Sequence, residues 1–375
     1  MMLPKIYMEL RQLEDIIKGK EALRALAHVI IRAHSFNTGM FPLVITSVGI
    51  SGSSLREVEV EDIDVILECS MKSELMSEWR DFKRKLSENF NKIWSFITEV
   101  STLTGRATIN HIIENFRDEL IDLGFKDLWI NEWFPWMRVS DFRRGIEKGL
   151  PIPYFDVKDL VSRYVKYGWR GKRLEVHVVI EGEASLIKIP YVRVWTNKEG
   201  VIVPDNKVLK KYFIDERKEL ITLSMNIIKG SWAELPPAYF NIKSALESTF
   251  EETTLISNAI KPYVLKSKEI HDKVKKMLLN EIKELEKLVK ESPKEDITEL
   301  MEYNTALSKK LKRMLVHAYI INTVKRYDII IKIAGKAHVK DINSYVNELR
   351  KYIIRNAAYQ GLRRKILREI LQNVS

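Results

Sequence analysis

The chain has 375 residues, of which 45% are apolar and 30% are charged, a composition typical of a soluble globular protein with two or three domains. Cys69 is its single cysteine, which excludes a disulfide framework and a cysteine-based zinc site and favours a reducing, cytoplasmic compartment. No run approaches the roughly 18 apolar residues that a membrane span needs, and the first residues lack the apolar core of a secretory signal. We therefore expect no association with membranes.

The net charge of +11 is concentrated at one end of the chain. Residues 1–200 hold 29 basic and 29 acidic side chains, and residues 201–300 hold 17 of each. Residues 301–375, the basic C-terminal block, hold 16 basic against 5 acidic side chains and account for the whole excess. This distribution excludes a uniformly basic, histone-like chain and predicts a localised surface for a polyanion.

Helix and strand patterns alternate in the first part of the chain. Apolar residues at three- and four-residue steps predict a helix over residues 4–36. Residues 42–50 form a β-branched run that ends in Gly and Ser, and residues 58–69 alternate apolar and acidic side chains, so each segment predicts a strand. Helical spacing returns over residues 72–100 and 107–124.

Aromatic residues and prolines dominate residues 125–170, where the pattern assigns no element. The aromatic group at 125–136 is more typical of a hydrophobic core than of a surface for base stacking, which is the alternative. Two β-like runs follow at residues 173–183 and 185–195, and their junction around Gly182 predicts a hairpin.

The strand signal ends at about residue 205, and helical patterns follow. A charged helix is predicted over residues 266–291, and Asp341 opens a final amphipathic helix. The predicted N-cap, first residue and capping-box acid of the helix between them are Ser292, Pro293 and Glu295.

The predicted fold class is α+β, with two domains. A mixed domain is expected over residues 1–205, with an N-terminal helix and a helical insertion over residues 71–165. An all-helical domain is expected over residues 206–375, and the basic C-terminal block forms its last part.

One segment after the first predicted strand carries the most informative pattern. The strand leads into a turn at Gly52 and Ser53, and Asp62 and Asp64 follow on the next strand. Two carboxylates at i and i+2 of a strand lie on one face, where their oxygens can bind divalent cations such as Mg²⁺. A Gly-Ser turn offers backbone amides and a hydroxyl to phosphate oxygens, and Arg56 adds a guanidinium.

This succession of Gly and Ser, a spacer and Asp-apolar-Asp resembles the motif of the DNA polymerase beta-like nucleotidyltransferase superfamily. The superfamily uses a third carboxylate on a neighbouring strand, and the Arg-apolar-acid-apolar sequence around Glu175 is similar to its setting. Glu181 and Glu183 are weaker alternatives for this third carboxylate. His177 shares the face of Glu175, but a packed or exposed strand histidine is the more common case.

The resemblance implies a nucleotidyltransferase-type catalytic domain with a mixed sheet and a two-metal phosphoryl transfer. Asp62 and Asp64 would hold two Mg²⁺ ions, and Glu175 would hold the ion that activates the attacking hydroxyl. The β- and γ-phosphates of a nucleoside triphosphate such as ATP would be positioned by Gly52, Ser53 and Arg56.

Cationic clusters in the basic C-terminal block are separated by apolar residues at helical intervals, which predicts amphipathic helices. The clusters lack the acidic partners that residues 266–300 contain, so a phosphate backbone would relieve their mutual repulsion. We expect them to bind nucleic acid, RNA ahead of DNA or a membrane surface. The first cluster is Lys309, Lys310, Lys312 and Arg313. The residues assigned to nucleic-acid binding are Arg350, Lys351, Arg355, Arg363, Arg364, Lys365 and Arg368.

These patterns favour an enzyme, a Mg²⁺-dependent nucleotidyltransferase that moves a nucleoside monophosphate from a nucleoside triphosphate to a hydroxyl acceptor. The acceptor favoured by the basic block is an RNA end, and pyrophosphate would be released. The first alternative is an oligonucleotide or cyclic-nucleotide synthase regulated by nucleic acid. The second is a catalytically inactive nucleic-acid-binding scaffold, in keeping with the short spacer before Asp62 and with glutamate at position 175.

Overall fold

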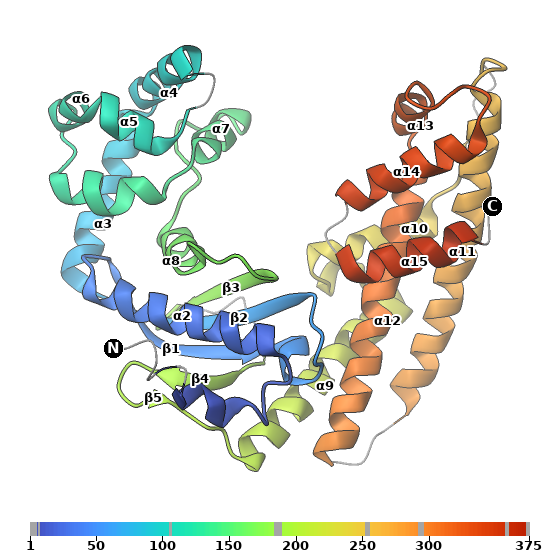
Figure 1. Ribbon diagram of the computed structural model, residues 1–375, viewed down its shortest axis with the longest axis horizontal. Coiled ribbons are helices and arrows are strands. Elements are labelled where there is room, and N and C mark those ends of the chain that lie inside the picture. Colours follow the sequence, from blue (N-terminus) through green and yellow to red (C-terminus); the bar gives the residue numbers. More distant parts are fainter. Residues whose placement is uncertain are drawn as a thin grey trace. The chain divides into compact units, whose positions relative to one another are not determined.

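The computed structural model has an α+β fold with one mixed sheet and many helices (Figure 1). The chain divides into two compact units, Met1–Asp205 and Asn206–Ser375. In the part of the chain that the structure describes, no helix has the length and apolar character needed to cross a membrane. The described residues are 6, 8–104, 107–183, 190–251, 256–291, 296–356 and 360–372.

The first unit is built on a five-stranded sheet in the order β3-β2-β1-β4-β5. Strands β1 and β2 are antiparallel, β3 joins β2 in parallel, and β4 lies antiparallel on the other side of β1. The strands are β1 (Leu43–Ser51), β2 (Asp62–Met71), β3 (Arg173–Ile180), β4 (Val192–Thr196) and β5 (Gly200–Val201).

The predicted hairpin between the β3 and β4 segments is wrong. After β3 the chain crosses to the opposite side of β1, so two strands separate β3 from β4 (Figure 1). Local alternation indicates that a segment forms a strand, but it carries no information on which strand becomes its partner. The parallel pairing of β3 with β2 follows a long helical connection, as parallel pairs require.

Helices cover one face of the sheet, and polar side chains of β2 lie on the other face. Helix α2 (Lys20–Thr38) packs against β1 and β2, and α8 (Val157–Lys166) packs against α2 and β3. Along β2 the side chains of Ile63 and Val65 are fully buried, while those of Asp62 and Asp64, which alternate with them, are partly exposed. Period-two alternation therefore places the two aspartates on the face away from the apolar core.

The helix predicted over residues 4–36 is interrupted. A short 3₁₀ turn at Arg11–Leu13 precedes α2, and α2 is preceded by Gly19 in extended conformation. A Cβ on Gly19 would lie 2.7 Å from the carbonyl oxygen of Val58, so only glycine allows the two backbone segments to approach this closely.

An aromatic core holds together the helical insertion between β2 and β3. Rings of Trp79, Phe82, Trp129, Trp133 and Phe134 contact one another, so the prediction that the aromatic group forms a core is confirmed for Trp129, Trp133 and Phe134. Trp136, at the end of the group, is only partly buried. The elements before α8 are α3 (Ser73–Glu88), α4 (Phe90–Thr104), α5 (Ile109–Asn115), α6 (Arg117–Asp122), η3 (Trp129–Trp133), η4 (Phe134–Trp136) and α7 (Val139–Glu147).

The described residues of the second unit are helical around a core of aliphatic side chains. The single final helix predicted after Asp341 is instead two helices, α14 and α15. The predicted N-cap residues Ser292, Pro293 and Glu295 lie outside the described residues, and Asp296 caps α12 by accepting hydrogen bonds from two backbone amides. The helices are α9 (Asn206–Lys229), α10 (Phe240–Glu247), α11 (Lys261–Lys290), α12 (Ile297–Val324), α13 (Tyr327–Ala334), α14 (Ile342–Asn356) and α15 (Gln360–Gln372).

Candidate metal centre

The parallel register of β2 and β3 brings three metal-ligating side chains together. Asp64 lies directly beside Glu175, and His177 follows Glu175 by two residues on the same face. One donor atom from each of these three side chains lies within 4.8 Å of the other two. His177 Nε2 is 3.5 Å from Asp64 Oδ1, and both side chains are about one-quarter exposed, 26% and 27%. The group is therefore partly shielded yet open to a ligand.

The hydrogen bonding of the His177 imidazole indicates whether the three side chains could hold a cation. Its Nε2 atom is buried and makes no hydrogen bond among the described residues. A buried nitrogen without a partner is costly, and a cation placed between Asp64 and Glu175 would use its lone pair. Two carboxylate oxygens and one imidazole nitrogen form a donor set that suits a divalent ion.

Asp62 lies at the edge of this group and does not belong to its closest three members. It is partly exposed on the same face of β2 as Asp64, and its partner in the register is Arg173. The guanidinium of Arg173 lies 2.7 Å from Glu175 Oε1 and so balances part of the negative charge. The site thus places two carboxylates on β2 and one on β3, with Arg173 paired to the carboxylate on β3.

The Gly-Ser turn lies next to Asp64. Ser51, the last residue of β1, is the cross-strand partner of Asp64, and the turn begins at the next residue, Gly52. Gly52 has a φ of +70°, and a Cβ at this position would lie 3.1 Å from Asp64 Oδ2. Glycine therefore serves both the left-handed backbone and the close approach to the carboxylate. The Ser53 side chain is largely buried under the turn.

Arg56 is placed differently from the sequence-based assignment to a triphosphate. Its side chain is 3% exposed, and its guanidinium lies 4.0 Å from the carboxylate of Glu57. In this position the guanidinium lies inside the protein and is not presented to solvent. A direct phosphate contact by Arg56 would require its side chain to move.

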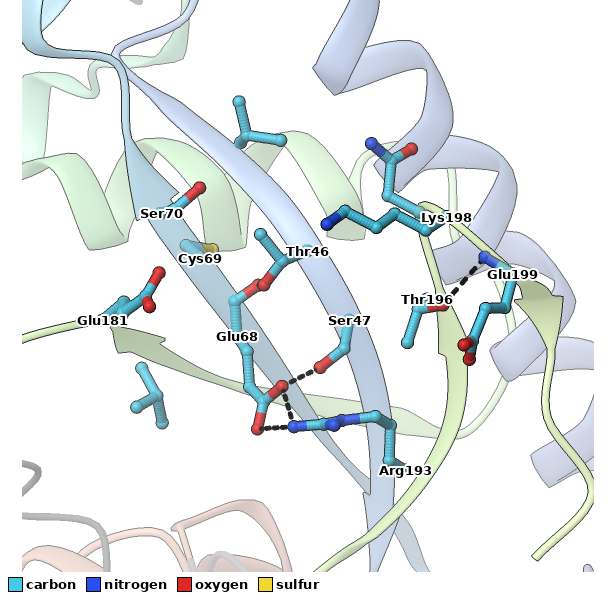
Figure 2. A pocket seen from close by; sticks show the side chains of 13 residues that line it. Thr46, Ser47, Glu68, Cys69, Ser70, Glu181, Arg193, Thr196, Lys198 and Glu199 are labelled. Atoms are coloured by element: carbon cyan, nitrogen blue, oxygen red, sulfur yellow. Dashed lines mark hydrogen bonds and ion pairs between the residues drawn. The ribbon is translucent and has the colours of Figure 1, made fainter.

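A polar cavity of about 730 Å³ lies further along the sheet (Figure 2). Glu68 lines it and follows Asp64 by four residues, on the same face of β2. The Glu68 carboxylate accepts two hydrogen bonds from Arg193 Nη2, 2.8 and 2.6 Å long, and further ones from the hydroxyls of Ser47 and Tyr191. The Tyr191 ring lies over Gly49, where a Cβ would come within 2.4 Å of it.

Hydrogen bonds from its neighbours keep the Glu68 carboxylate ionised, although burial opposes its charge. Burial opposes ionisation of Glu68, but hydrogen bonds from Arg193, Ser47 and Tyr191 outweigh it and lower the pKa of the carboxyl. Burial, followed by the hydrogen bond to Glu68, raises the pKa of Tyr191 to about 12. Glu68 is thus an ionised carboxylate held in place by three neighbours.

The two alternatives to Glu175 as the third carboxylate lie away from the three-residue group. Glu181 lines the cavity of Glu68, and Glu183 forms an ion pair with Lys158 at 2.7 Å.

The basic C-terminal block is only partly a free cationic surface. Arg363 is fully buried and donates to the carbonyl of Ile354, which corrects its assignment to nucleic-acid binding. Arg350 is partly exposed, and Lys351 is exposed and lies 2.7 Å from Glu348. The other assigned side chains are exposed; they are Arg355, Arg364, Lys365 and Arg368.

The expectation that these clusters lack acidic partners is wrong for the first of them. Lys310 lies 2.8 Å from Glu281, and Arg313 lies 3.4 Å from the same carboxylate. Arg313 also lies 3.5 Å from Glu369 on α15. Tertiary packing of α11, α12 and α15 therefore pairs charges that are far apart in sequence.

The sequence patterns underestimated His177 as a site residue and missed Glu68. His177 belongs to the three-residue group, and its signal was the i+2 spacing from Glu175 on a strand. Glu68 continues the alternation of Asp62 and Asp64 along β2, so the same period-two rule identifies it. The partners of Glu68 on β4 come from the sheet order, which no local pattern reveals.

Comparisons of the chain with protein-family models, with curated proteins and with solved structures gave no match. The structure shows an α+β protein with a candidate metal centre at Asp64, Glu175 and His177.

Proposed function

We propose that the protein is a divalent-cation-dependent nucleotidyltransferase that transfers a nucleoside monophosphate to a hydroxyl acceptor and releases pyrophosphate. One observation carries the proposal. Asp64 lies between the left-handed Gly52 turn on one side and the carboxylate of Glu175 on the other. Phosphoryl transfer needs a phosphate cradle and a carboxylate-held cation at adjacent positions, and these residues supply that juxtaposition.

The roles of the residues follow from their positions. Asp62, Asp64 and Glu175 would hold Mg²⁺, with His177 as a further donor to the ion nearest Asp64. A bound divalent cation would lower the pKa of the acceptor hydroxyl and neutralise charge on the departing pyrophosphate. Gly52 has no Cβ, so phosphate oxygens could approach the backbone of the turn closely.

An RNA end is the acceptor that the charge distribution supports best. Arg355, Arg364, Lys365 and Arg368 in the helical unit are exposed cations, and such groups gain most from a phosphate backbone. We propose that RNA contacts these four exposed cations. Arg363 is not among them because its side chain is buried.

The deciding experiment is incubation of the protein with each labelled nucleoside triphosphate, Mg²⁺ or Mn²⁺, and total RNA. We expect labelled RNA ends, and we expect the Asp62→Ala, Asp64→Ala double variant to lose activity by about 10²–10³-fold or more, because it removes the carboxylates that stabilise the developing charge. A matched control is the Glu59→Ala, Glu119→Ala double variant, which removes two exposed acids from the same unit.

The same screen separates the competing functions. Small nucleotide products formed without added RNA would favour a synthase of oligonucleotides or cyclic nucleotides. The absence of any product with all four nucleotides would favour a binding scaffold. Transfer that survives the Asp62→Ala, Asp64→Ala pair would contradict the assignment of the site.

A further inference from the structure

A second cavity in the first unit, of about 480 Å³, combines cations and aromatic rings. It lies at the carboxyl end of α8, between that helix and η4, close to the β3 edge of the sheet. Its described lining contains three basic side chains, two aromatic rings and no carboxylate. The basic residues are Arg138, Arg163 and Lys166, and the aromatic ones are Trp136 and Tyr167. The contrast is informative because residues 1–200 hold equal numbers of acids and bases.

Two of the three cations are available to an anion. Arg163 is already neutralised, since its guanidinium lies 2.6 Å from the buried carboxylate of Asp141. Arg138 is exposed and Lys166 is half-buried, and neither forms an ion pair among the described residues. Burial is the main cause that lowers the pKa of Lys166, while the nearby carboxylate of Glu175 acts in the opposite direction. Lys166 is thus a partly desolvated cation near the metal centre.

The two aromatic rings of the cavity contact one another and neighbouring side chains. The Trp136 ring lies 4.8 Å from Tyr164 and 5.6 Å, edge to face, from Tyr167. Arg163 donates to the backbone carbonyl of Trp136 at 2.9 Å, which ties η4 to α8. The guanidinium of Arg32 lies 4.0 Å from the centre of the Tyr164 ring, in a cation–π contact. Tyr167 is 66% exposed and forms an open side of the cavity.

We propose that this cavity binds the terminal nucleotide of the acceptor strand, with its base against Trp136 and Tyr167 and its phosphate at Arg138 and Lys166. Stacking on aromatic rings combined with a cationic phosphate contact is the chemistry by which proteins hold single-stranded nucleic acid. The inference rests on the proposed nucleotidyltransferase function.

Topology distinguishes the acceptor from the nucleoside triphosphate. Asp64 lies on β2, with the Gly52 turn on the side of β1 and Glu175 on the side of β3. The turn is the expected cradle for the triphosphate, whereas Lys166 ends α8, the helix that packs against β3, the strand of Glu175. An acceptor held at Lys166 would therefore approach the metal centre from the side that the triphosphate leaves open.

The test measures binding to the full-length protein in EDTA, so that no cation contributes. The probes are a short single-stranded oligoadenylate with a free 3′ hydroxyl and a 5′ fluorophore, and ATP. We expect Trp136→Ala to weaken oligoadenylate binding about tenfold or more, given the usual contribution of a stacked base. The Arg138→Gln, Lys166→Gln double variant should have an effect of similar size, with ATP binding unchanged in both. Tyr167→Ala provides a second aromatic variant, at a side chain that is 66% exposed.

The matched control is the Arg143→Gln, Arg144→Gln double variant, which removes two exposed charges from α7. Oligoadenylate binding that is equal in the wild type and the pocket variants, or equally weakened in the control, would overturn the proposal. Pocket variants that weaken only ATP binding would also overturn it, because the cavity would then hold the free nucleotide.

The binding and transfer assays distinguish a wrong binding site from a wrong catalytic function. If no nucleotide is transferred but oligoadenylate binding depends on the pocket residues, the catalytic proposal fails and the binding site stands. If transfer occurs but binding is insensitive to the pocket variants, only the binding site is rejected. The Asp62→Ala, Asp64→Ala pair should bind oligoadenylate in EDTA as the wild type does.

Discussion

His177 adds a nitrogen donor to a site whose other donors are carboxylate oxygens, and this should be visible in the choice of metal. Imidazole favours ions late in the first transition series over Mg²⁺. We expect His177→Ala to reduce Co²⁺ affinity by about tenfold or more while Mg²⁺ affinity changes by less than about threefold. Calorimetric titration of each metal tests this, with His338→Ala as an exposed control. Unchanged Co²⁺ affinity would show that the imidazole is not a ligand.

Glu68 links charge to stability at the residue scale. Its pKa is below the ordinary value of 4.5 in the folded protein, so its stabilising contribution is present above about pH 4.5 and is lost as the pH falls through the folded pKa. We expect Glu68→Gln to lower the free energy of unfolding at neutral pH by about 1 kcal/mol, a modest value because Arg193 is half exposed.

Urea denaturation of the wild type and Glu68→Gln at a series of pH values measures this contribution. The difference between the two proteins should be largest near neutrality and should shrink at acidic pH. Glu199→Gln alters an exposed acid of the same cavity and should change the stability by less than about 0.5 kcal/mol. A difference that is independent of pH would contradict the assignment.

At the scale of elements, Asp141 joins three segments of the helical insertion. Its carboxylate, 2% exposed, accepts two hydrogen bonds from Arg163 on α8 and one from the backbone amide of Arg138 before α7. Arg163 in turn holds η4 through the carbonyl of Trp136. Asp141→Ala would leave Arg163 nearly buried without its counter-charge, so we expect a loss of about 3 kcal/mol in unfolding free energy.

Thermal and urea denaturation measure the effect of Asp141→Ala, with the exposed Asp122→Ala on α6 as control. The control should lie within about 0.5 kcal/mol of the wild type. A loss below about 1 kcal/mol for Asp141→Ala would mean that water or another group replaces the carboxylate.

At the scale of the whole molecule, the surplus positive charge is divided between structural and exposed cations. Arg363 and Lys310 are used in packing or ion pairs, whereas Arg364, Lys365 and Arg368 are exposed on α15. We expect replacement of the three exposed residues by Gln to weaken RNA binding. The slope of log affinity against log salt should fall by about 2, since each phosphate contact on a single strand contributes about 0.7.

Fluorescence anisotropy of labelled RNA at several salt concentrations measures this slope. The Lys276→Gln, Lys283→Gln, Lys287→Gln triple variant removes the same charge from the exposed face of α11 and should leave the slope nearly unchanged. An equal loss in both triple variants would indicate that net charge alone, and not α15, governs binding.

Sequence patterns alone determined the fold class, the two strands that flank the Gly52 turn, and the aromatic core of the insertion. These features depend on local rules: period-two alternation places Asp62 and Asp64 on one face, and dense aromatic residues are buried together. The same rules gave the wrong partner for β3, because strand pairing depends on contacts between distant segments.

The resemblance already implied that Glu175 joins Asp64, but only the tertiary structure added His177 to them, paired Glu68 with Arg193, and removed Arg363 from the surface. Each of these outcomes joins residues that are far apart in sequence, or depends on which side of a helix packs inward. Alternation fixes the face on which a side chain lies, whereas its neighbours on that face follow from the order and register of the strands, which the packed sheet decides.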